Sequence, residues 1–239
     1  MAKRKNARST QGRKPPARSP RSKKARAARI DYQEGGVYQL KLTLLDVQPQ
    51  IWRRLLVTNC TLEELHFIIQ SVMGWENDHL YEFEVGKKRY AGSDPMGRMG
   101  EAQTSRVDLG KVVPLVGTRF YYIYDFGDDW HHEVLVEAYG PIDEGREYPV
   151  CIAGERACPP EDVGGAWGYA DLVEALKDPE HERHEEFMEW LGEFDPEAFD
   201  LDAVNKELKG MSGPDSLSYE DEDEDYDDDE GWDGGSPIP

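Results

Sequence analysis

Basic and acidic residues are separated along this chain, and that separation limits how much of it can fold. Residues 1–30 contain twelve Lys and Arg and no Asp or Glu, whereas residues 215–239 contain twelve Asp and Glu and no Lys or Arg. Each block repels itself and has too little apolar surface to offset the entropy of ordering a chain. We therefore predict a disordered basic tail at residues 1–33, a folded domain at residues 34–212 and a disordered acidic tail at residues 213–239.

The segment between the tails has the composition of one acidic globular domain. Residues 31–214 retain 16 of the 28 basic residues and 37 of the 49 acidic residues. A segment of about 180 residues can bury a substantial hydrophobic core. We expect one core and not two.

The sequence contains no signal that would place it in a membrane or outside the cell. No stretch reaches the roughly 20 consecutive apolar residues of a membrane helix, and the basic N-terminus is not followed by an apolar run. The three cysteines, Cys60, Cys151 and Cys158, are odd in number and sparse, which suits free thiols in a reducing compartment. We expect a cytoplasmic protein. An Arg-rich, acid-free start is also typical of transit peptides and nuclear import signals, so that alternative stays open.

The first half of the domain predicts two hairpins separated by a helix. Residues 37–45 alternate between apolar and polar, residues 51–57 form a second β-like run, and a turn with Pro49 joins them. Thr61 and Glu64 have the spacing of a capping box, which predicts a helix over residues 62–73 that ends at Gly74. The run at 81–85 and the turn into Tyr90 predict the second hairpin.

The second half predicts a third hairpin followed by helices. Residues 91–110 are rich in Gly, Ser, Asp and Met and are interpreted as a long loop. Residues 119–124 and 130–138 are β-like runs, and Gly127 between them can take the positive φ of a tight connection. Residues 148–152 form another short extended segment, and the pattern is helical from Tyr169 onward. The prediction is an α+β fold: a mostly antiparallel sheet of hairpins, one helix after the first hairpin and a C-terminal helical layer.

Several stretches of this chain resemble one protein family over residues 35–210. They are Pro49–Leu55, Thr61–Trp75 with His79, Tyr124–Trp130 and Cys158–Gly165, with a looser match through Tyr169, Asp195-Pro196, Phe199 and Asn205. On these motifs the chain is identified as a member of the plasmid pRiA4b ORF-3-like family, which implies an α+β domain. Some members are labelled as resolvases or as passenger proteins of insertion elements. The sequence shows neither the activated Ser near arginines of a serine resolvase nor the Tyr with an Arg-His-Arg set of a tyrosine recombinase.

The tip of the third hairpin concentrates metal-ligand chemistry. Three carboxylates and two imidazoles lie within eight residues there. Carboxylates bind hard divalent cations and imidazoles bind zinc or iron, so Asp125, Asp128, Asp129 and His132 are candidate ligands. Trp130 in the same run is a further candidate functional residue. Neighbouring strand residues point to opposite faces, so at most one of the two histidines can be a ligand. The alternative is that Asp125 and Asp128 cap a tight turn.

The stretch from Cys158 to Gly165 predicts a stiff loop that displays two acids. Its Pro-Pro pair forces extended geometry and its Gly pair permits close backbone approach. Glu161 and Asp162 between them either face a metal or basic partner, or cap backbone amides near the following helix. Cys151 and Cys158 have six residues between them, not the two to four of a zinc knuckle, which disfavours a zinc site that uses both.

Arg53 and Arg54 are the remaining candidate functional residues. Strand alternation places one of them on each sheet face, so one should be partly buried and require a carboxylate partner. Asp125, Asp128 or Glu161 are the carboxylates that we consider for this role. Such a pair would make the acidic motifs structural.

The functional hypothesis is a non-enzymatic interaction module linked to mobile elements or nucleic acid. Residues 3–29 can neutralise phosphates and give salt-sensitive, sequence-independent affinity for nucleic acid, while the acidic domain recognises an unidentified protein partner. No catalytic residue and no cofactor is expected in this interpretation. The alternative is a divalent-metal-dependent hydrolase or nuclease that uses the Asp/His hairpin together with the Cys-Pro-Pro-Glu-Asp loop.

Overall fold

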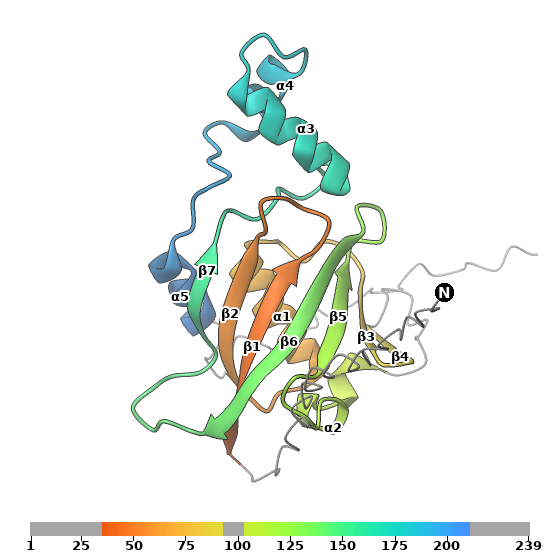
Figure 1. The fold of residues 1–239 in the computed structure, drawn as a ribbon, viewed down its shortest axis with the longest axis vertical. Coiled ribbons are helices and arrows are strands. Elements are labelled where there is room, and N and C mark those ends of the chain that lie inside the picture. Colours follow the sequence, from red (N-terminus) through yellow and green to blue (C-terminus); the bar gives the residue numbers. More distant parts are fainter. Residues whose placement is uncertain (1–34, 93–102, 211–239) are drawn as a thin grey trace, which may run out of the picture.

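The computed structural model describes residues 35–92 and 103–210 (Figure 1). The predicted tails, residues 1–33 and 213–239, lie outside this part of the chain. Within it, none of the helices combines the length and the apolar character that crossing a membrane requires.

The described domain is organised around one antiparallel sheet of seven strands, in the order β4-β3-β5-β6-β1-β2-β7. The strands are β1 (Gly36–Leu44), β2 (Trp52–Thr58), β3 (Tyr81–Val85), β4 (Lys88–Ala91), β5 (Arg119–Tyr124), β6 (Trp130–Pro141) and β7 (Val150–Glu155). All neighbouring strands pair antiparallel. The three predicted hairpins are β1–β2, β3–β4 and β5–β6, and the predicted α+β class is confirmed.

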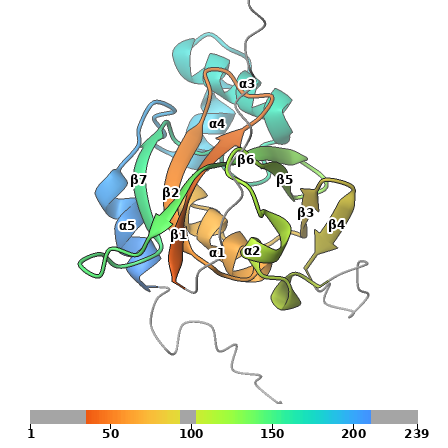
Figure 2. The same ribbon diagram turned by 60° about the horizontal axis from the view of Figure 1, so that its bottom comes forward.

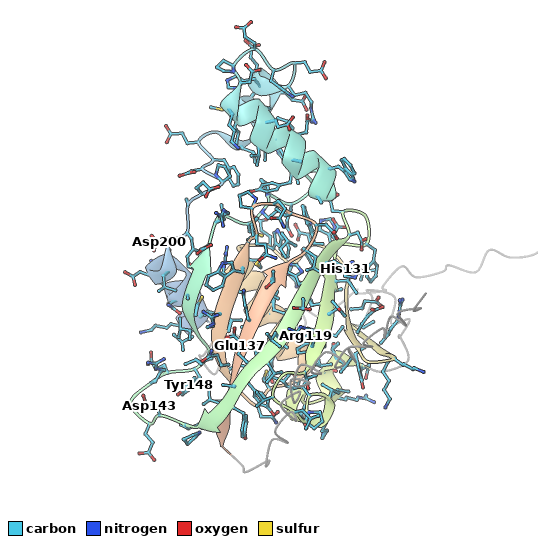
Figure 3. The ribbon with its side chains drawn as sticks, in the orientation of Figure 1. Arg119, His131, Glu137, Asp143, Tyr148 and Asp200 are labelled. Carbon is cyan, nitrogen blue, oxygen red and sulfur yellow. The ribbon has the colours of Figure 1, made fainter. Side chains whose placement is uncertain are left out.

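The two faces of the sheet differ in polarity, as the alternation in β1 predicts. The apolar set of β1 is at most 1% exposed and forms the centre of the core; it consists of Tyr38, Leu40, Leu42 and Leu44. On the opposite face, Glu137 of β6 accepts hydrogen bonds from Gln39 and Arg54. Figure 3 shows Glu137 on this second face, which the described helices leave uncovered. An antiparallel sheet tolerates one solvated face because each strand alternates between apolar and polar side chains.

The helix α1 (Leu62–Met73) begins and ends where the sequence predicts. Thr61 Oγ1 accepts a hydrogen bond from the amide of Glu64, whose carboxylate accepts from the amide of Thr61, so the predicted capping box is confirmed. Gly74 takes a left-handed conformation at φ 86° and closes the helix. The apolar stripe of α1 covers the buried face of the sheet.

The C-terminal helices α3 (Gly165–Lys177), α4 (His184–Leu191) and α5 (Leu201–Gly210) occupy two places. Helices α3 and α4 pack on each other beyond one end of the sheet, whereas α5 packs against α1 and β7 (Figures 1 and 2). The Asn205 side chain of α5 accepts from the amide of Cys151 at 2.8 Å and donates to its carbonyl at 2.9 Å. This amide therefore ties α5 to the outer edge of β7.

Two local predictions are wrong. The segment 91–110 is not one long loop: Ala91 belongs to β4, and helical turns form at η1 (Thr104–Arg106) and α2 (Leu109–Val112). Leu109 is fully buried and its amide donates to the Cys60 carbonyl, which holds this segment against the domain. Residues 93–102 of this segment lie outside the described chain. In the β5–β6 connection, Asp125 and Asp129 take the positive φ, 55° at each, in place of Gly127. Aspartate tolerates this conformation because its short side chain bonds to the local backbone.

Candidate functional site

Three connections meet at the end of the sheet that faces α3. They are the α1–β3 loop at 74–80, the β5–β6 hairpin tip at 125–129 and the β7–α3 loop at 156–164. The amide of Asp125 donates to the Leu80 carbonyl at 2.9 Å, and the amide of Gly164 donates to Asp128 Oδ2 at 3.1 Å. In Figure 3, His131 marks the start of β6 next to this tip. Residues far apart in sequence are thereby brought together.

One side chain from each connection contributes to a His–Asp–Asp cluster, formed by His79, Asp125 and Asp162. One ligand atom from each residue lies within 4.8 Å of the other two. The Nε2 atom of His79 is 3.4 Å from Asp162 Oδ1 and 3.8 Å from Asp125 Oδ2. Ligands about 2.1 Å from one tetrahedral ion are about 3.4 Å apart. The separations in the cluster therefore match those of ligands that share a metal ion.

The His79 Nε2 atom is shielded from solvent and has no hydrogen-bond partner. A buried nitrogen without a partner loses the hydrogen bond that it makes to water in the unfolded chain. Both carboxylates face it, but at distances and angles that make no hydrogen bond. A cation held between the three groups would satisfy Nε2 and both carboxylates together.

Unusual backbone conformations gather in the loops that form the cluster. Positive φ angles occur at Asn77 (66°), Asp125 (55°), Asp129 (55°) and Asp162 (58°). At Asp125, Oδ1 accepts from the amide of Gly127 at 2.8 Å, so the side chain stabilises its own turn and leaves Oδ2 for His79. Left-handed conformations of non-glycine residues carry strain and tend to collect at functional sites.

Glu161 of the β7–α3 connection links the α1–β3 connection to the end of β5. Its Oε1 accepts from the Tyr124 hydroxyl at 2.5 Å, and its Oε2 accepts from the amide of Glu76 at 3.2 Å. Trp75 adds a hydrogen bond from Nε1 to the Pro159 carbonyl at 3.0 Å. Burial and the Glu161 carboxylate together raise the pKa of Tyr124, so its hydroxyl stays a donor. Both oxygens of Glu161 therefore have structural partners.

A buried hydrogen-bond network holds the α1–β3 loop from below. His66 of α1 contacts the Tyr122 hydroxyl through Nδ1 at 2.7 Å and the Asn77 Oδ1 through Nε2 at 2.6 Å. Gln70 donates to the same hydroxyl at 2.8 Å. Burial lowers the pKa of His66 to about 4, so the ring is neutral and its Nε2 carries the proton toward Asn77. This network fixes the loop that carries His79.

The region around the cluster is strongly acidic. Glu76, Asp78 and Glu161 form a second group whose ligand atoms also lie within 4.8 Å of one another. Within the described chain, none of these three residues, nor Asp125 or Asp162, forms an ion pair with Lys or Arg. Adjacent carboxylates without basic partners favour the binding of cations.

The structure separates the predicted hairpin residues by role. Asp125 and Asp128 face the β7–α3 loop, where Asp128 bonds to Gly164, and Asp129 lies 3.5 Å from the ring of His131 outside the cluster. Trp130 is 1% exposed and His132 is fully buried, so both belong to the core. Burial lowers the pKa of His132 to about 3, and the ring is neutral.

The expectation of a carboxylate partner for the buried arginine is wrong. Arg53 is the buried one, at 2% exposure, and it donates to the backbone carbonyls of Trp52, Val72 and Glu155. Arg54 faces the other side and pairs with Glu137. Backbone carbonyls of β2, α1 and β7 take the place of the expected carboxylate, which strand alternation alone could not indicate.

Two further findings concern His79 and the three cysteines. His79 is the functional residue that sequence reasoning did not select; its signals were its place in the resemblance and its position next to a run of polar loop residues. The three cysteines are free, as predicted. In the described ranges, neither Cys151 nor Cys158 joins a group of three metal ligands, so a zinc site built on both is not supported.

Comparison with known proteins places the chain in a family. The model of the plasmid pRiA4b ORF-3-like protein matches residues 36–203. The chain belongs to this family. Among pRiA4b ORF-3-like relatives, the uncharacterised protein y4hQ of Sinorhizobium fredii is 40% identical over 180 residues, which cover 74% of this chain and 92% of the relative.

A solved structure supports the fold of this pRiA4b ORF-3-like domain. The crystal structure of the protein of unknown function MM3350 from Methanosarcina mazei Go1 is 42% identical and superposes with a TM-score of 0.65. The match covers 72% of this chain and 98% of that one. The family and the fold are thus established, and function has to be argued from the site.

Proposed function

We propose that this domain binds a divalent metal ion through His79, Asp125 and Asp162 and uses it for hydrolysis. The observation that carries the proposal is the geometry of the cluster: three potential ligands from three connections, with Nε2 at 3.4 and 3.8 Å from two carboxylate oxygens. Hydrogen bonds of Glu161 and Asp128 hold these connections together without using the facing ligand atoms.

The ligand set indicates the kind of ion and its chemistry. One imidazole and two carboxylates suit a divalent transition ion such as Zn²⁺ or Mn²⁺ better than Ca²⁺ or Mg²⁺, which prefer oxygen alone. Three protein ligands would leave a position for water, and a bound Zn²⁺ would lower the pKa of that water to about 7. The surrounding carboxylates, including Glu76 and Asp78, disfavour a polyanionic substrate. A hydrolase of neutral or cationic substrates fits this electrostatic environment better than a nuclease.

Elemental mass spectrometry tests the proposal on full-length protein reconstituted with Zn²⁺ or Mn²⁺ and then dialysed. The variants Asp125→Asn and Asp162→Asn remove ligand charge, while asparagine preserves the left-handed backbone and the turn to Gly127. Asp129→Asn is the matched control, because Asp129 also has φ 55° but lies outside the cluster. We expect about one ion per chain in the wild type and the control, and a loss of at least tenfold in affinity in both ligand variants. Wild-type protein without metal, or ligand variants that bind as well as the control, would refute the site.

A second candidate function rests on the charge of the N-terminal segment. We also propose that residues 3–29 bind nucleic acid without sequence preference, in an interaction module with an unidentified protein partner and a link to mobile elements. The support is the twelve basic residues without an acid among residues 1–30. Replacing those Lys and Arg by Gln in the full chain should remove DNA binding and its steep salt dependence. DNA affinity that is unchanged in this variant would contradict it.

A further inference from the structure

A cavity lies between the end of α1 and the start of α5. We call it the Arg53 pocket; its volume is about 370 Å³, and its walls include Arg53, Val72, Cys158, Phe199, Ala203 and Lys206. Asp200, labelled in Figure 3 at the start of α5, also lines it, at the β7 side of the sheet. Binding pockets for small molecules start at about 300 Å³. The cavity is therefore large enough for a small ligand.

The guanidinium of Arg53 is a buried cation without an anionic partner. Arg53 is 2% exposed and forms no ion pair within the described chain. Burial lowers the pKa of Arg53, and the neighbouring Cys158 and Cys151 offset this only in part. Burial also raises the pKa of both thiols, so neither supplies a negative charge. A buried charge is normally paired because desolvation destabilises it.

The hydrogen bonds of Arg53 leave one nitrogen available. Nε donates to the Val72 carbonyl at 2.9 Å, and Nη1 donates to the carbonyls of Trp52 and Glu155 at 3.0 Å each. Nη2 makes no hydrogen bond to the residues that the structure describes. The Phe199 ring lies 4.4 Å from the guanidinium carbon and forms an apolar wall of the same pocket. Nη2 of a planar, always charged donor group is thus left to donate to a ligand.

The other charged groups of the pocket have mixed signs. Lys206 would attract an anion, whereas Asp200 and Glu207 would repel it. The Asp200 carboxylate already accepts hydrogen bonds from the amides of Asp202 and Ala203 at 3.0 and 2.9 Å. All of these groups except Arg53 are solvent-exposed, so screening weakens them, while the buried guanidinium keeps its full effect.

We propose that the Arg53 pocket binds a small ligand through an oxyanion group, a carboxylate or a phosphate. The two N–H groups of Nη2 can donate charge-assisted hydrogen bonds to the oxygens of such a group. The apolar walls would hold the uncharged remainder of the ligand. None of the three proposed metal ligands lines this pocket.

Thermal unfolding of the full chain, with inorganic phosphate and acetate titrated separately against chloride at equal ionic strength, tests the proposal. Replacing Arg53 itself risks unfolding, since it bonds to three buried carbonyls, so the test variant is Ala203→Leu, which fills the pocket from the exposed surface of α5. The matched control is Ala170→Leu, an exposed alanine of α3 outside the pocket. At ten times the dissociation constant, a ligand of the native state should raise the unfolding midpoint by about 3 to 6 °C.

We expect a saturable rise in the wild type and in Ala170→Leu, and at least a tenfold weaker response in Ala203→Leu. The larger of the phosphate and acetate responses identifies the preferred oxyanion. A rise of the same size in Ala203→Leu would assign the anion to the basic N-terminal segment or to general salt effects, and would overturn the proposal. The absence of any saturable rise in the wild type would overturn it as well.

Discussion

A single methyl group added at Gly165 should measure how closely α3 approaches the β5–β6 hairpin. Gly165 has φ 66°, and a Cβ atom there would lie 2.5 Å from the carbonyl oxygen of Asp128. Gly74, the C-terminal cap of α1, has φ 86° but no atom within 4 Å of such a Cβ. The two glycines thus have similar backbone strain for alanine and differ in the space around them.

The expected costs follow from these two terms. Alanine in the left-handed region costs about 1 to 2 kcal/mol at either position. At Gly165, the overlap with Asp128 must be relieved by a backbone shift, which adds about 1 to 3 kcal/mol. Gly165→Ala should therefore lower the free energy of unfolding by about 2 to 5 kcal/mol, against about 1 to 2 kcal/mol for Gly74→Ala. In a domain of this size each 1 kcal/mol lowers the unfolding midpoint by about 2 to 4 °C.

Urea unfolding followed by tryptophan fluorescence gives both free energies. Gly165→Ala should also weaken metal binding, because the shifted hairpin carries Asp125, whereas Gly74→Ala should leave metal affinity unchanged. Equal destabilisation by the two variants would refute the close approach of α3 to the hairpin. A strongly destabilised Gly165→Ala variant with normal metal affinity would refute the link between that contact and the cluster.

Three further predictions concern buried polar groups. Tyr124→Phe removes the hydrogen bond to the Glu161 carboxylate and should cost about 1.5 to 3 kcal/mol in urea unfolding, because the acceptor is charged; a neutral effect would contradict the bracing role of Glu161. Burial lowers the pKa of His66 to about 4 and of His132 to about 3, below the value of 6.5 in the unfolded chain. Between these values the unfolded chain takes up protons that the folded chain does not, so the free energy of unfolding is highest above pH 6.5 and falls as pH falls. Between pH 6 and 4.5, each ring should add about 1.4 kcal/mol per pH unit to the slope of the free energy of unfolding against pH. His66→Gln should remove one of these two contributions. An unchanged slope in this variant would show that His66 titrates normally. Arg53→Gln should destabilise by about 3 kcal/mol or more, and the same change at the half-exposed Arg54 by less than about 1 kcal/mol; similar costs at both positions would contradict their opposite burial.

Local sequence rules predicted the elements of this fold well, because the relevant signals are short-range. The capping box at Thr61 and Glu64 and the alternation in β1 act over a few residues and needed no knowledge of tertiary contacts. The segment 91–110 was predicted wrongly because its Gly, Ser and Asp content concealed Leu109, which is fully buried and whose amide bonds to the Cys60 carbonyl just before α1. The positive φ was assigned to Gly127 because glycine is the common choice, while the aspartates on either side stabilise that conformation through their side chains.

Only part of the candidate site could be predicted, because its residues come from distant parts of the sequence. The acids at Asp125 and Asp162 were selected because they lie in unusual motifs, but nothing in the sequence pairs residues 37 positions apart across two loops. His79 completes the cluster from a third loop, and only the tertiary arrangement reveals it. Asp128 and Glu161 are carboxylates like Asp125 and Asp162. Their hydrogen bonds to Gly164 and Tyr124 distinguish them, as structural residues, from the candidate metal ligands of the cluster.

The tie between Asn205 and Cys151 has a consequence for how copies of this protein behave toward one another. An edge strand with free backbone groups is a template to which another chain can add a strand and begin aggregation. The amide of Asn205 occupies both the N–H and the C=O of Cys151, as a neighbouring strand would, and so closes that part of the β7 edge. At the opposite edge, Ala91 of β4 forms a bridge with Gln103, and the exposed Lys88 places a charge on the same strand. The two edges of the sheet are thus less open to the addition of a strand than the strand order alone implies.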